Sequence, residues 1–445
     1  MASTTMSLSR HPRAYLVAAF IAGALVTLGL KDLYPDLERR FQRRHDPNNP
    51  DADTATPNNK QLRYRSSFLW GVTLEDHDAD DAVVDGIQGC IGNTPLVRIE
   101  SLSVATGRTI LAKAEFLNGA GGSPKDRVAL AMITEAERAG LLVPHRGDTV
   151  YEGSVGSTGI SLAALARARG YRAHICMPDD QSAEKSDLLL SLGAVVERVP
   201  VAPITSPSHF VNLARRRAAQ HAATHKDGSL GFFADQFESP ANWHAHHDST
   251  GPEIVRQTSA NLDAFVAGAG TGGTISGVAR HLKLDSKLAH VRVVLADPQG
   301  SGLYNRVRHG VLYANTEREG TRRRQQVDSI VEGIGINRLT QNFDAGQDLI
   351  DDAVRVSDHQ ACLMARWLVD HDGIFVGSSS AVNCVAAVVT AMALPPGSRV
   401  VTILCDSGSR HLSKFWKHVK HLGPENKQDA AQDAHILSLL GLATT

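Results

Sequence analysis

Four segments place glycines and hydroxyl residues where a strand would pass into a helix, and the first of them suits an anion. VAGAGTGGTISGVARHLK, from Val266, holds a glycine-rich turn before a helix. Backbone N–H groups at such a helix start bind anions, and glycines let a phosphate come close. The turn also matches GxGxxG, with Asp297 as the acidic residue of a dinucleotide site. A nucleotide and a simple phosphate both remain open, although Thr271 and Thr274 favour a compact phosphate.

The second segment, EFLNGAGGSPKDRVALAMI, carries Lys125 between a glycine turn and a predicted helix. The positive end of a helix disfavours an ammonium ion, so we expect a lowered pKa for this lysine. A lysine that gives up its proton readily is what Schiff-base chemistry requires. The alternative for a lone lysine is a surface position paired with Asp126, and only the surrounding segments favour chemistry.

The third and fourth segments complete a possible site. In YEGSVGSTGISLAALA, the hydroxyls of Ser154, Ser157 and Thr158 and the local amides could hold a carboxylate, or simply cap a helix. In GIFVGSSSAVNCVAAVV, Ser379 could bond a ring nitrogen in a cleft, although its spacing favours a helix cap. Two anion sites and one lysine together describe a phosphate-bearing cofactor and an amino-acid substrate.

The elements that must position these segments alternate along the chain. Buried strands are predicted at 109–116, 148–153, 172–178, 194–200, 264–270, 291–297 and 399–406, and helices at 128–140, 160–170, 184–193 and 275–284. Strands that alternate with helices imply an α/β fold with parallel sheets covered on both faces. The alternation is long enough for two lobes.

The overall composition limits the kinds of partner and metal site that the chain is expected to have. Among 445 residues, 46 Lys and Arg balance 47 Asp and Glu, so no long-range attraction to nucleic acid is expected. The five cysteines form no CxxC pair and are odd in number, which favours a reducing compartment over disulfides or a zinc site. WHAHH at 243–247 lacks matching carboxylate or cysteine spacing, so we interpret it as an exposed helix and expect no metal.

The N-terminus differs from the rest of the chain. Residues 14–30 are free of charge and flanked by basic residues, which favours a membrane anchor within 1–31 over a cleaved secretory signal or presequence. The polar segment 32–63 is a predicted flexible linker, 64–425 a catalytic domain and 426–445 a C-terminal tail. The anchor resembles those of mitochondrial outer-membrane proteins, so we expect a single-pass protein of that membrane.

Together these segments resemble the cysteine synthase and cystathionine β-synthase family of fold-type II pyridoxal-phosphate enzymes, including its fungal membrane-anchored mitochondrial members. The resemblance covers about 88–420 and rests on IGNTPLVRI, SPKDRVA, GSTGISLA, ADQFESPAN, TGPEI, GTGGTISG, EGIG, SSSA and DSGSRHLSKF, in this order. It implies a two-lobed fold like that of the tryptophan synthase β chain, with the smaller lobe at about 127–235. It also implies pyridoxal 5'-phosphate as cofactor and a homodimer.

The resemblance assigns a role to each matching residue. It implies that Lys125 forms the Schiff base and that Ser379 bonds the pyridine nitrogen. The implied phosphate loop is Gly270, Thr271, Gly272, Gly273 and Thr274, with Ser157 near the cofactor. The implied substrate-carboxylate region is Ser154, Gly156, Ser157, Thr158 and Gln236.

The implied reaction replaces the β-substituent of an O-activated serine, such as O-acetylserine, with sulfide or a thiol, giving L-cysteine. Lys125 would remove the α-proton. Alternatives are cystathionine synthesis, β-elimination (cysteine desulfhydration or serine deamination) and a tethered cofactor-binding scaffold with little catalysis.

The chain departs from the family pattern beside the substrate. Val155 replaces a serine and Ser157 an asparagine, while Gly119–Ala120 replaces a proline, Pro124 precedes the lysine and Ala381 replaces a glycine. We therefore expect an altered substrate preference or weakened cysteine synthase activity.

Overall fold

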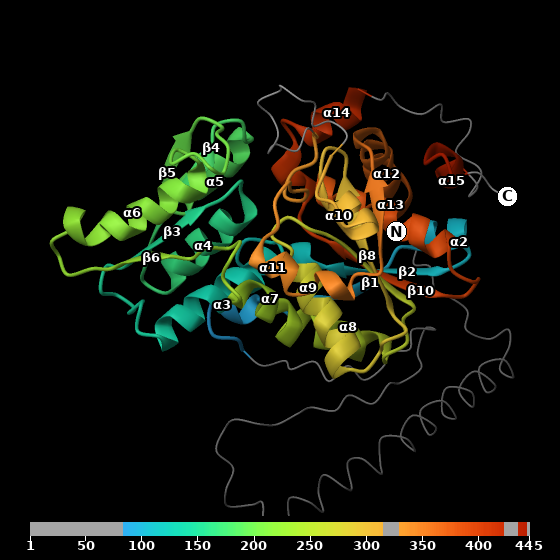
Figure 1. Ribbon diagram of the computed structural model, residues 1–445, viewed down its shortest axis with the longest axis horizontal. Coiled ribbons are helices and arrows are strands. Elements are labelled where there is room, and N and C mark those ends of the chain that lie inside the picture. Colours follow the sequence, from blue (N-terminus) through green and yellow to red (C-terminus); the bar gives the residue numbers. More distant parts are fainter. Residues whose placement is uncertain (1–82, 315–328, 422–434, 443–445) are drawn as a thin grey trace, which may run out of the picture. The chain divides into compact units, whose positions relative to one another are not determined.

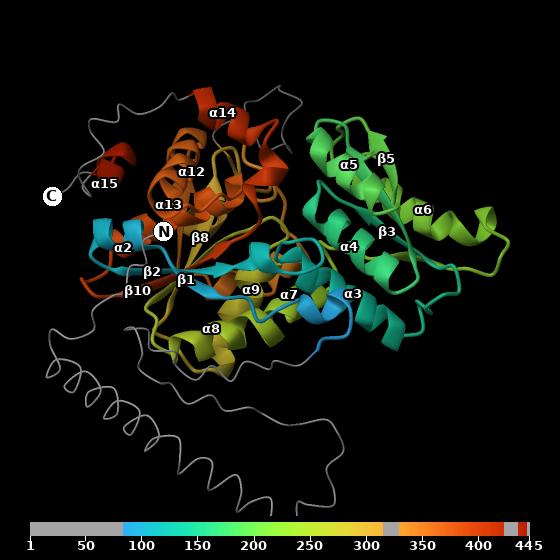
Figure 2. The same cartoon turned by 180° about the vertical axis from the view of Figure 1, so that it is seen from behind.

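The computed structural model describes residues 83–314, 329–421 and 435–442, and within them the chain forms two parallel sheets with helices on their faces. The larger sheet has the order β1-β2-β10-β7-β8-β9, in which only the β1–β2 pair is antiparallel. Its strands are β1 (Leu96–Arg98), β2 (Thr109–Ala114), β7 (Ala264–Gly268), β8 (Arg292–Pro298), β9 (Asp352–Val356) and β10 (Arg399–Leu404). Figure 2 shows β1 and β2 along one edge of this sheet.

The smaller sheet is parallel throughout, with the order β5-β4-β3-β6. It consists of β3 (Thr149–Gly153), β4 (Arg172–Pro178), β5 (Val195–Val199) and β6 (Gly231–Phe233). The helices of this lobe, green in Figure 1, are α3 (Lys125–Arg138), α4 (Ser157–Ala168), α5 (Ala183–Ser191) and α6 (Phe210–Thr224). The apolar residues of α3 and α4 pack on β3 and β4 in one buried cluster.

The larger sheet is buried on both faces because successive strand residues point to opposite sides. Val294 packs with α12 and α13 on one face, whereas Val293 and Leu295 pack with α8 and α9 on the other. The helices here are α2 (Glu100–Thr106), α7 (Ala241–Ala245), α8 (Gly251–Thr258), α9 (Gly273–Arg280), α10 (Leu303–His309), α11 (Gln341–Asp344), α12 (Asp358–Asp372), α13 (Ser378–Met392), α14 (Phe415–His421) and α15 (His435–Leu439).

Short helical turns join these elements. The 3-10 turns are η1 (Ile87–Cys90), η2 (Glu115–Leu117), η5 (Gln347–Leu349) and η6 (Gly408–His411). Two turns are π-helical, η3 (His246–Thr250) and η4 (His281–Asp285).

The observed strands and helices agree closely with those expected from the sequence, and β4 has the predicted bounds 172–178. No helix among the described residues is long and apolar enough to cross a membrane. The expected anchor at 1–31, with its helix at 14–30, and the linker at 32–63 lie outside the described residues, as does most of the tail at 426–445. All five cysteines are free.

The interpretation of 243–247 as an exposed helix is wrong in part. His246 is fully buried, because the segment packs on α9 rather than on solvent. Its ring bonds the hydroxyls of Thr250 (2.9 Å) and Thr274 (3.1 Å). Burial, with the nearby Lys125 and Arg127 cations, holds the pKa of His246 well below its usual value, so the ring is neutral.

Candidate active site

One cavity of about 680 Å³ collects nearly all of the residues expected from the sequence. It lies at the carboxyl ends of parallel strands from both sheets, where α/β folds generally bind ligands. The segments that follow β3, β4, β7 and β10 all contribute to its wall. The expected residues that line it are Lys125, Ser154, Ser157, Thr158, Gln236, Gly270, Thr271, Gly272, Thr274 and Ser379. Gly156 and Gly273 lie in the same turns behind this lining.

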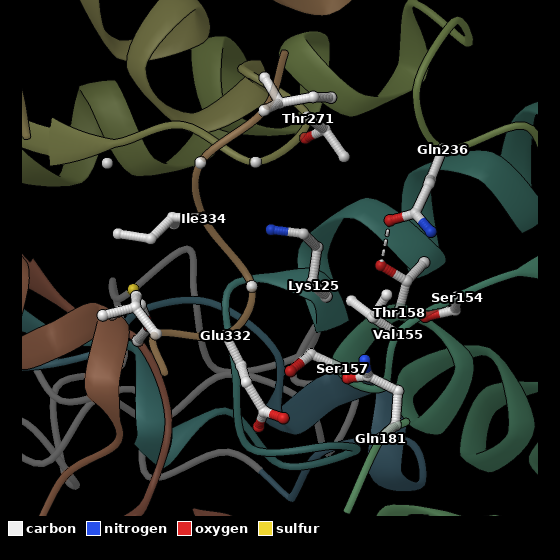
Figure 3. A pocket seen from close by; sticks show the side chains of 18 of the residues that line it. Lys125, Ser154, Val155, Ser157, Thr158, Gln181, Gln236, Thr271, Glu332 and Ile334 are labelled. Carbon is white, nitrogen blue, oxygen red and sulfur yellow. Dashed lines mark hydrogen bonds between the residues drawn. The ribbon is translucent and has the colours of Figure 1, made fainter. Parts of the chain in front are cut away.

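Lys125 is the first residue of α3, and its amine projects into the cavity between Thr271 and Ser157 (Figure 3). In the described part of the chain this amine has no ion-pair or hydrogen-bond partner, whereas Lys185 and Lys414 of the same cavity both pair with Glu332. Burial lowers the pKa of Lys125, so its amine is more easily neutral than that of an ordinary lysine. The pKa of Lys125 is therefore lowered in the expected direction, with burial as its main cause.

The turn before Lys125 is held by Asp126, so the surface pairing of these two residues is excluded. The Asp126 carboxylate accepts the N–H groups of Gly121 (2.8 Å) and Gly122 (2.9 Å) and the hydroxyl of Ser161 (2.5 Å). A side chain at Gly121 would meet Asp126 at 2.6 Å. These bonds fix the start of α3 and therefore the point from which the Lys125 side chain leaves the backbone.

The glycine-rich loop from Gly270 to Thr274 joins β7 to α9 and packs closely against its surroundings. A Cβ at Gly270 would lie 2.2 Å from the Gly333 carbonyl, and Gly272 has a left-handed backbone (φ +87°). The Thr271 hydroxyl accepts the amide of Asn242 (2.9 Å). The loop therefore presents backbone N–H groups at the start of a helix, in a turn where added side chains would collide with neighbouring residues.

A phosphate fits this loop, and the dinucleotide alternative has no support. The first N–H groups of α9 have no partners within the helix and point outward at its N-terminus, as anion sites require. Asp297 is not among the cavity-lining residues. It accepts the N–H of Tyr304 (2.7 Å), and burial raises the pKa of its carboxyl to about 7.

The loop after β3 forms the opposite side of the cavity (Figure 3). The Ser154 hydroxyl accepts the N–H groups of Gly156 and Gly159, both at 3.1 Å, and so shapes the loop. Gly156 has φ +148°, and α4 begins at Ser157. Val155 lines the cavity with an apolar side chain. The turn thus directs a helix N-terminus and hydroxyls toward the centre, an arrangement suited to a carboxylate.

Gln236 fixes this loop from the segment after β6. Its side-chain oxygen accepts the hydroxyl of Thr158 (2.5 Å), and its amide donates to the carbonyl of Gly153 (2.9 Å). Its backbone N–H donates to Glu152 (3.1 Å), and burial raises the pKa of that carboxyl to about 8. Gln236 therefore holds Thr158 in place as well as lining the cavity.

The three serines at the start of α13 have separate contacts, and the expected helix cap is wrong. Gly377 is the N-cap residue, and no side chain caps this helix. Ser378 accepts the N–H of Glu332 (3.0 Å) and Ser380 that of Cys405 (2.8 Å), so both tie α13 to neighbouring segments. Ser379 lines the cavity beside the Cys405 thiol.

A buried charge cluster at the cavity wall was missed by the sequence reasoning. Lys185 of α5 and Glu332 pair at 2.6 Å across the two lobes. His411 lies between Asp406 (3.0 Å) and Glu332 (3.4 Å), and Lys414 also pairs with Glu332 (3.2 Å). Glu332 belongs to the EGIG segment, the one signal that could have drawn attention to this region.

The cluster sets the charge of its members. Burial alone would lower the pKa of His411, but Asp406 and Glu332 raise it to about 9. Burial would likewise raise the pKa of Glu332, but His411 and the two lysines hold it well below its usual range. At neutral pH the cluster therefore contains charged carboxylates and a charged imidazole, and the Lys185–Glu332 pair joins the two lobes.

Comparison with known proteins shows which family the chain belongs to. Residues 87–406 match the family described as pyridoxal-phosphate dependent enzymes. The chain belongs to this family. Its cofactor is accordingly pyridoxal 5'-phosphate, and its fold is that of fold-type II enzymes. The phosphate loop and the unpaired lysine of the cavity fit this cofactor.

Within this family, the chain is most usefully compared with individual relatives and solved structures. The chain is 67% identical to cysteine synthase 2 of Neurospora crassa over 98% of this chain and 99% of the relative. A candidate mitochondrial cysteine synthase of Saccharomyces cerevisiae is 56% identical, with 76% and 85% covered. Among solved structures, O-ureido-L-serine synthase is 30% identical with a TM-score of 0.64, covering 78% of this chain and 98% of that one.

Proposed function

We propose that this enzyme makes L-cysteine by β-replacement on an O-activated serine such as O-acetylserine, with sulfide as the nucleophile. The observation that carries the proposal is the amine of Lys125, which has no partner in the part of the chain that the structure describes and faces a glycine-rich loop and a serine- and threonine-rich loop in one cavity. Relatives named cysteine synthase support this reaction. The cavity is also large enough for the cofactor and a small amino acid together.

Residues of this chain would hold the cofactor at three points. The N–H groups and hydroxyls of 270–274 would bind its phosphate, Ser379 would bond its pyridine nitrogen, and the Lys125 amine would hold its aldehyde. When bound, pyridoxal phosphate supplies an aldehyde that captures amino groups and a ring that accepts electrons. A neutral serine does not keep the ring nitrogen protonated, which favours β-elimination and replacement over transamination.

The substrate would bind through its carboxylate. The start of α4 provides the backbone N–H groups of Ser157 and Thr158 and the hydroxyl of Ser157, while the Thr158 hydroxyl donates its proton to Gln236 and so fixes the loop. This places the α-carbon near Lys125, whose Nζ removes the α-proton and later returns a proton to the same carbon. The lowered pKa of Lys125 suits this role, because the amine must be neutral to accept a proton.

We further propose a mitochondrial enzyme anchored in the outer membrane by residues 14–30, acting as a homodimer. The charge-free run with basic flanks supports the anchor, and the Saccharomyces cerevisiae relative named as mitochondrial supports the organelle. Carbonate extraction of mitochondria tests the anchor: the full chain should stay with the membranes, and a chain beginning at residue 64 should be released. Release of the full chain would refute it.

The reaction is tested with purified protein, O-acetylserine and sulfide, measuring cysteine. Lys125→Ala should form no cysteine, whereas Lys226→Ala, at an exposed lysine of the smaller lobe, should match the wild type. Pyruvate and ammonia as the main products, even with sulfide present, would indicate β-elimination instead. Cystathionine from homocysteine at a higher kcat/KM than cysteine from sulfide would favour that synthesis, and no product from any pair would favour a scaffold.

A further inference from the structure

Two groups of side chains outside the active-site cavity bring three potential metal ligands together in the described parts of the chain. One group lies in the larger lobe and consists of His247, His281 and Asp285. The other lies in the smaller lobe and consists of His174, Cys176 and Glu197. Within each group, one ligand atom from each residue lies within 4.8 Å of the others. The contacts of the two groups differ, and the difference favours the first.

The His247 group converges on one carboxylate oxygen. Oδ2 of Asp285 lies 2.6 Å from Nε2 of His247 and 3.8 Å from Nδ1 of His281. Two imidazole nitrogens and a carboxylate oxygen are a donor set that Zn²⁺ takes when three protein ligands and a water surround it. The side chains are 24%, 17% and 50% exposed in the order His247, His281 and Asp285, so an ion can enter from solvent.

A second carboxylate, that of Asp248, contacts the other ring nitrogen of His247. Asp248 Oδ1 lies 2.5 Å from Nδ1 of His247, on the side of the ring opposite Asp285. A neutral imidazole has one N–H donor, so it can satisfy only one of two carboxylates. If Nδ1 donates to Asp248, the lone pair of Nε2 faces the Asp285 carboxylate, so both atoms are oriented to donate to one metal ion. A carboxylate that holds the second nitrogen of a histidine is the usual support for a metal-bound imidazole.

The backbone around the group is unusual as well. His247 lies in the π-helical turn η3, and His281 and Asp285 are the first and last residues of the π-helical turn η4. Such turns are rare and occur often at functional sites. Both are connected to the phosphate loop: η4 continues α9, which begins at Gly273, and the neighbouring His246 of η3 bonds Thr274.

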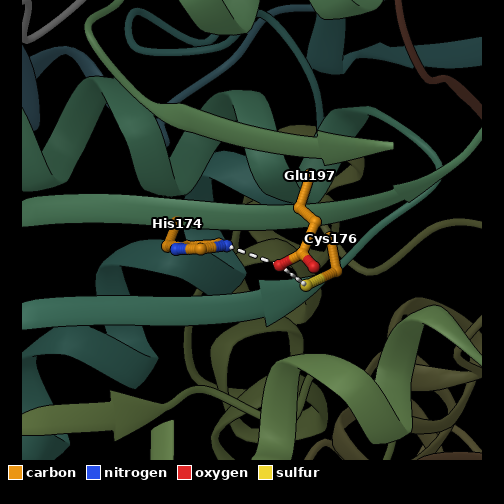
Figure 4. Close-up of side chains that lie close together, drawn as sticks. All are labelled: His174, Cys176 and Glu197. Carbon is orange, nitrogen blue, oxygen red and sulfur yellow. Dashed lines mark hydrogen bonds and ion pairs between the residues drawn. The ribbon is translucent and has the colours of Figure 1, made fainter. Parts of the chain in front are cut away.

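The His174 group is better explained as a network without a metal. Figure 4 shows the three side chains facing one another on β4 and β5, where Cys176 and Glu197 are paired across the strands. Arg217 already donates two bonds to Glu197, at 2.7 and 3.1 Å. Burial raises the pKa of the Cys176 thiol to about 12. A metal would have to displace the arginine and also remove this proton.

We propose that His247, His281 and Asp285 form a binding site for a divalent transition-metal ion, with Zn²⁺ as the ion that fits best. The ion joins η3 to η4 and so stabilises the two segments that lie behind the phosphate loop. This site is separate from the active-site cavity and does not depend on the proposed reaction.

Cobalt binding to chelator-treated holoenzyme tests the site, because Co²⁺ takes similar ligands and its visible absorption reports its coordination. We expect one equivalent of Co²⁺ to bind to the wild type and to be displaced by Zn²⁺. His281→Ala and Asp285→Asn should weaken binding roughly 100-fold or more, since loss of a ligand exceeds loss of its support. Asp285→Asn keeps the size of a half-exposed side chain, so folding is maintained.

Two matched controls decide the assignment. His290→Ala removes an exposed histidine of the same lobe and should bind Co²⁺ like the wild type. Cys176→Ser should also bind normally. Failure of the wild type to bind one equivalent would overturn the proposal. So would unchanged binding in both His281→Ala and Asp285→Asn, or loss of binding in Cys176→Ser, which would move the site to the smaller lobe.

Discussion

Replacing His411 by asparagine should remove a pH-dependent contribution to stability. The imidazole is 2% exposed and lies 3.0 Å from Asp406 and 3.4 Å from Glu332. Burial and, to a smaller extent, Lys185 oppose its charge, but the two carboxylates prevail and raise the pKa of His411 to about 9. Asparagine can still donate a hydrogen bond to Asp406, yet it cannot carry the positive charge.

The magnitude follows from the pKa of the folded and unfolded states. An unfolded histidine titrates near 6.5, and the difference from about 9 corresponds to about 3 kcal/mol at about 1.4 kcal/mol per pH unit. Because the folded pKa is the higher one, this stabilisation is complete below about pH 6.5. It declines as the pH rises and is lost above about 9.

Urea unfolding of the holoenzyme from about pH 6 to about pH 10 measures the effect. The wild type should lose about 3 kcal/mol more than His411→Asn over this interval, and the two curves should approach each other at high pH. His290→Asn, at an exposed histidine, should follow the wild type. Parallel curves for wild type and His411→Asn would refute the reasoning.

Three further predictions concern the cavity. Gly270→Ala places a Cβ 2.2 Å from the carbonyl of Gly333, so the loop must shift. This should weaken pyridoxal phosphate binding by about 1–3 kcal/mol, or roughly 5- to 150-fold. Unchanged affinity in a fluorescence titration would contradict this prediction. Thr158→Val removes the 2.5 Å bond to Gln236 and leaves that amide oxygen unpaired, at a cost of about 1–3 kcal/mol, so kcat/KM for O-acetylserine should fall roughly 5- to 150-fold. A normal value in steady-state kinetics would show that this bond does not shape the substrate loop. Val155→Ser restores the hydroxyl usual in the family and should raise kcat/KM for O-acetylserine relative to the wild type. A lower value would show that the valine suits this substrate.

The local parts of the site were predictable because short segments determine them. The turn into α4 and the turn into α9 each follow a buried strand, and glycines and hydroxyl residues mark them. Periodicity alone predicted β4 with its observed bounds. Lys125 at the start of α3 also follows from a glycine turn next to a helical pattern.

The remaining parts depend on tertiary contacts that no local pattern contains. Lys185 and Glu332 are 147 positions apart and meet only when the lobes come together. Ser379 has the spacing of a helix cap, yet Gly377 takes that position and the serine side chain lines the cavity instead. His246 lies in a polar stretch that suggests exposure, but its helix packs on α9, where the ring bonds a phosphate-loop threonine.

The most direct test of the central claim is the identity of the lysine that holds the cofactor. Three lysines line the cavity, and Lys185 and Lys414 are both paired with Glu332, whereas the amine of Lys125 has no partner among the described residues. Borohydride reduction of the holoenzyme, followed by peptide mass analysis, should place the reduced cofactor on the peptide that contains Lys125 and on no other. Cofactor attached to Lys185 or Lys414 would contradict the account, as would a Lys125→Ala protein that still traps it.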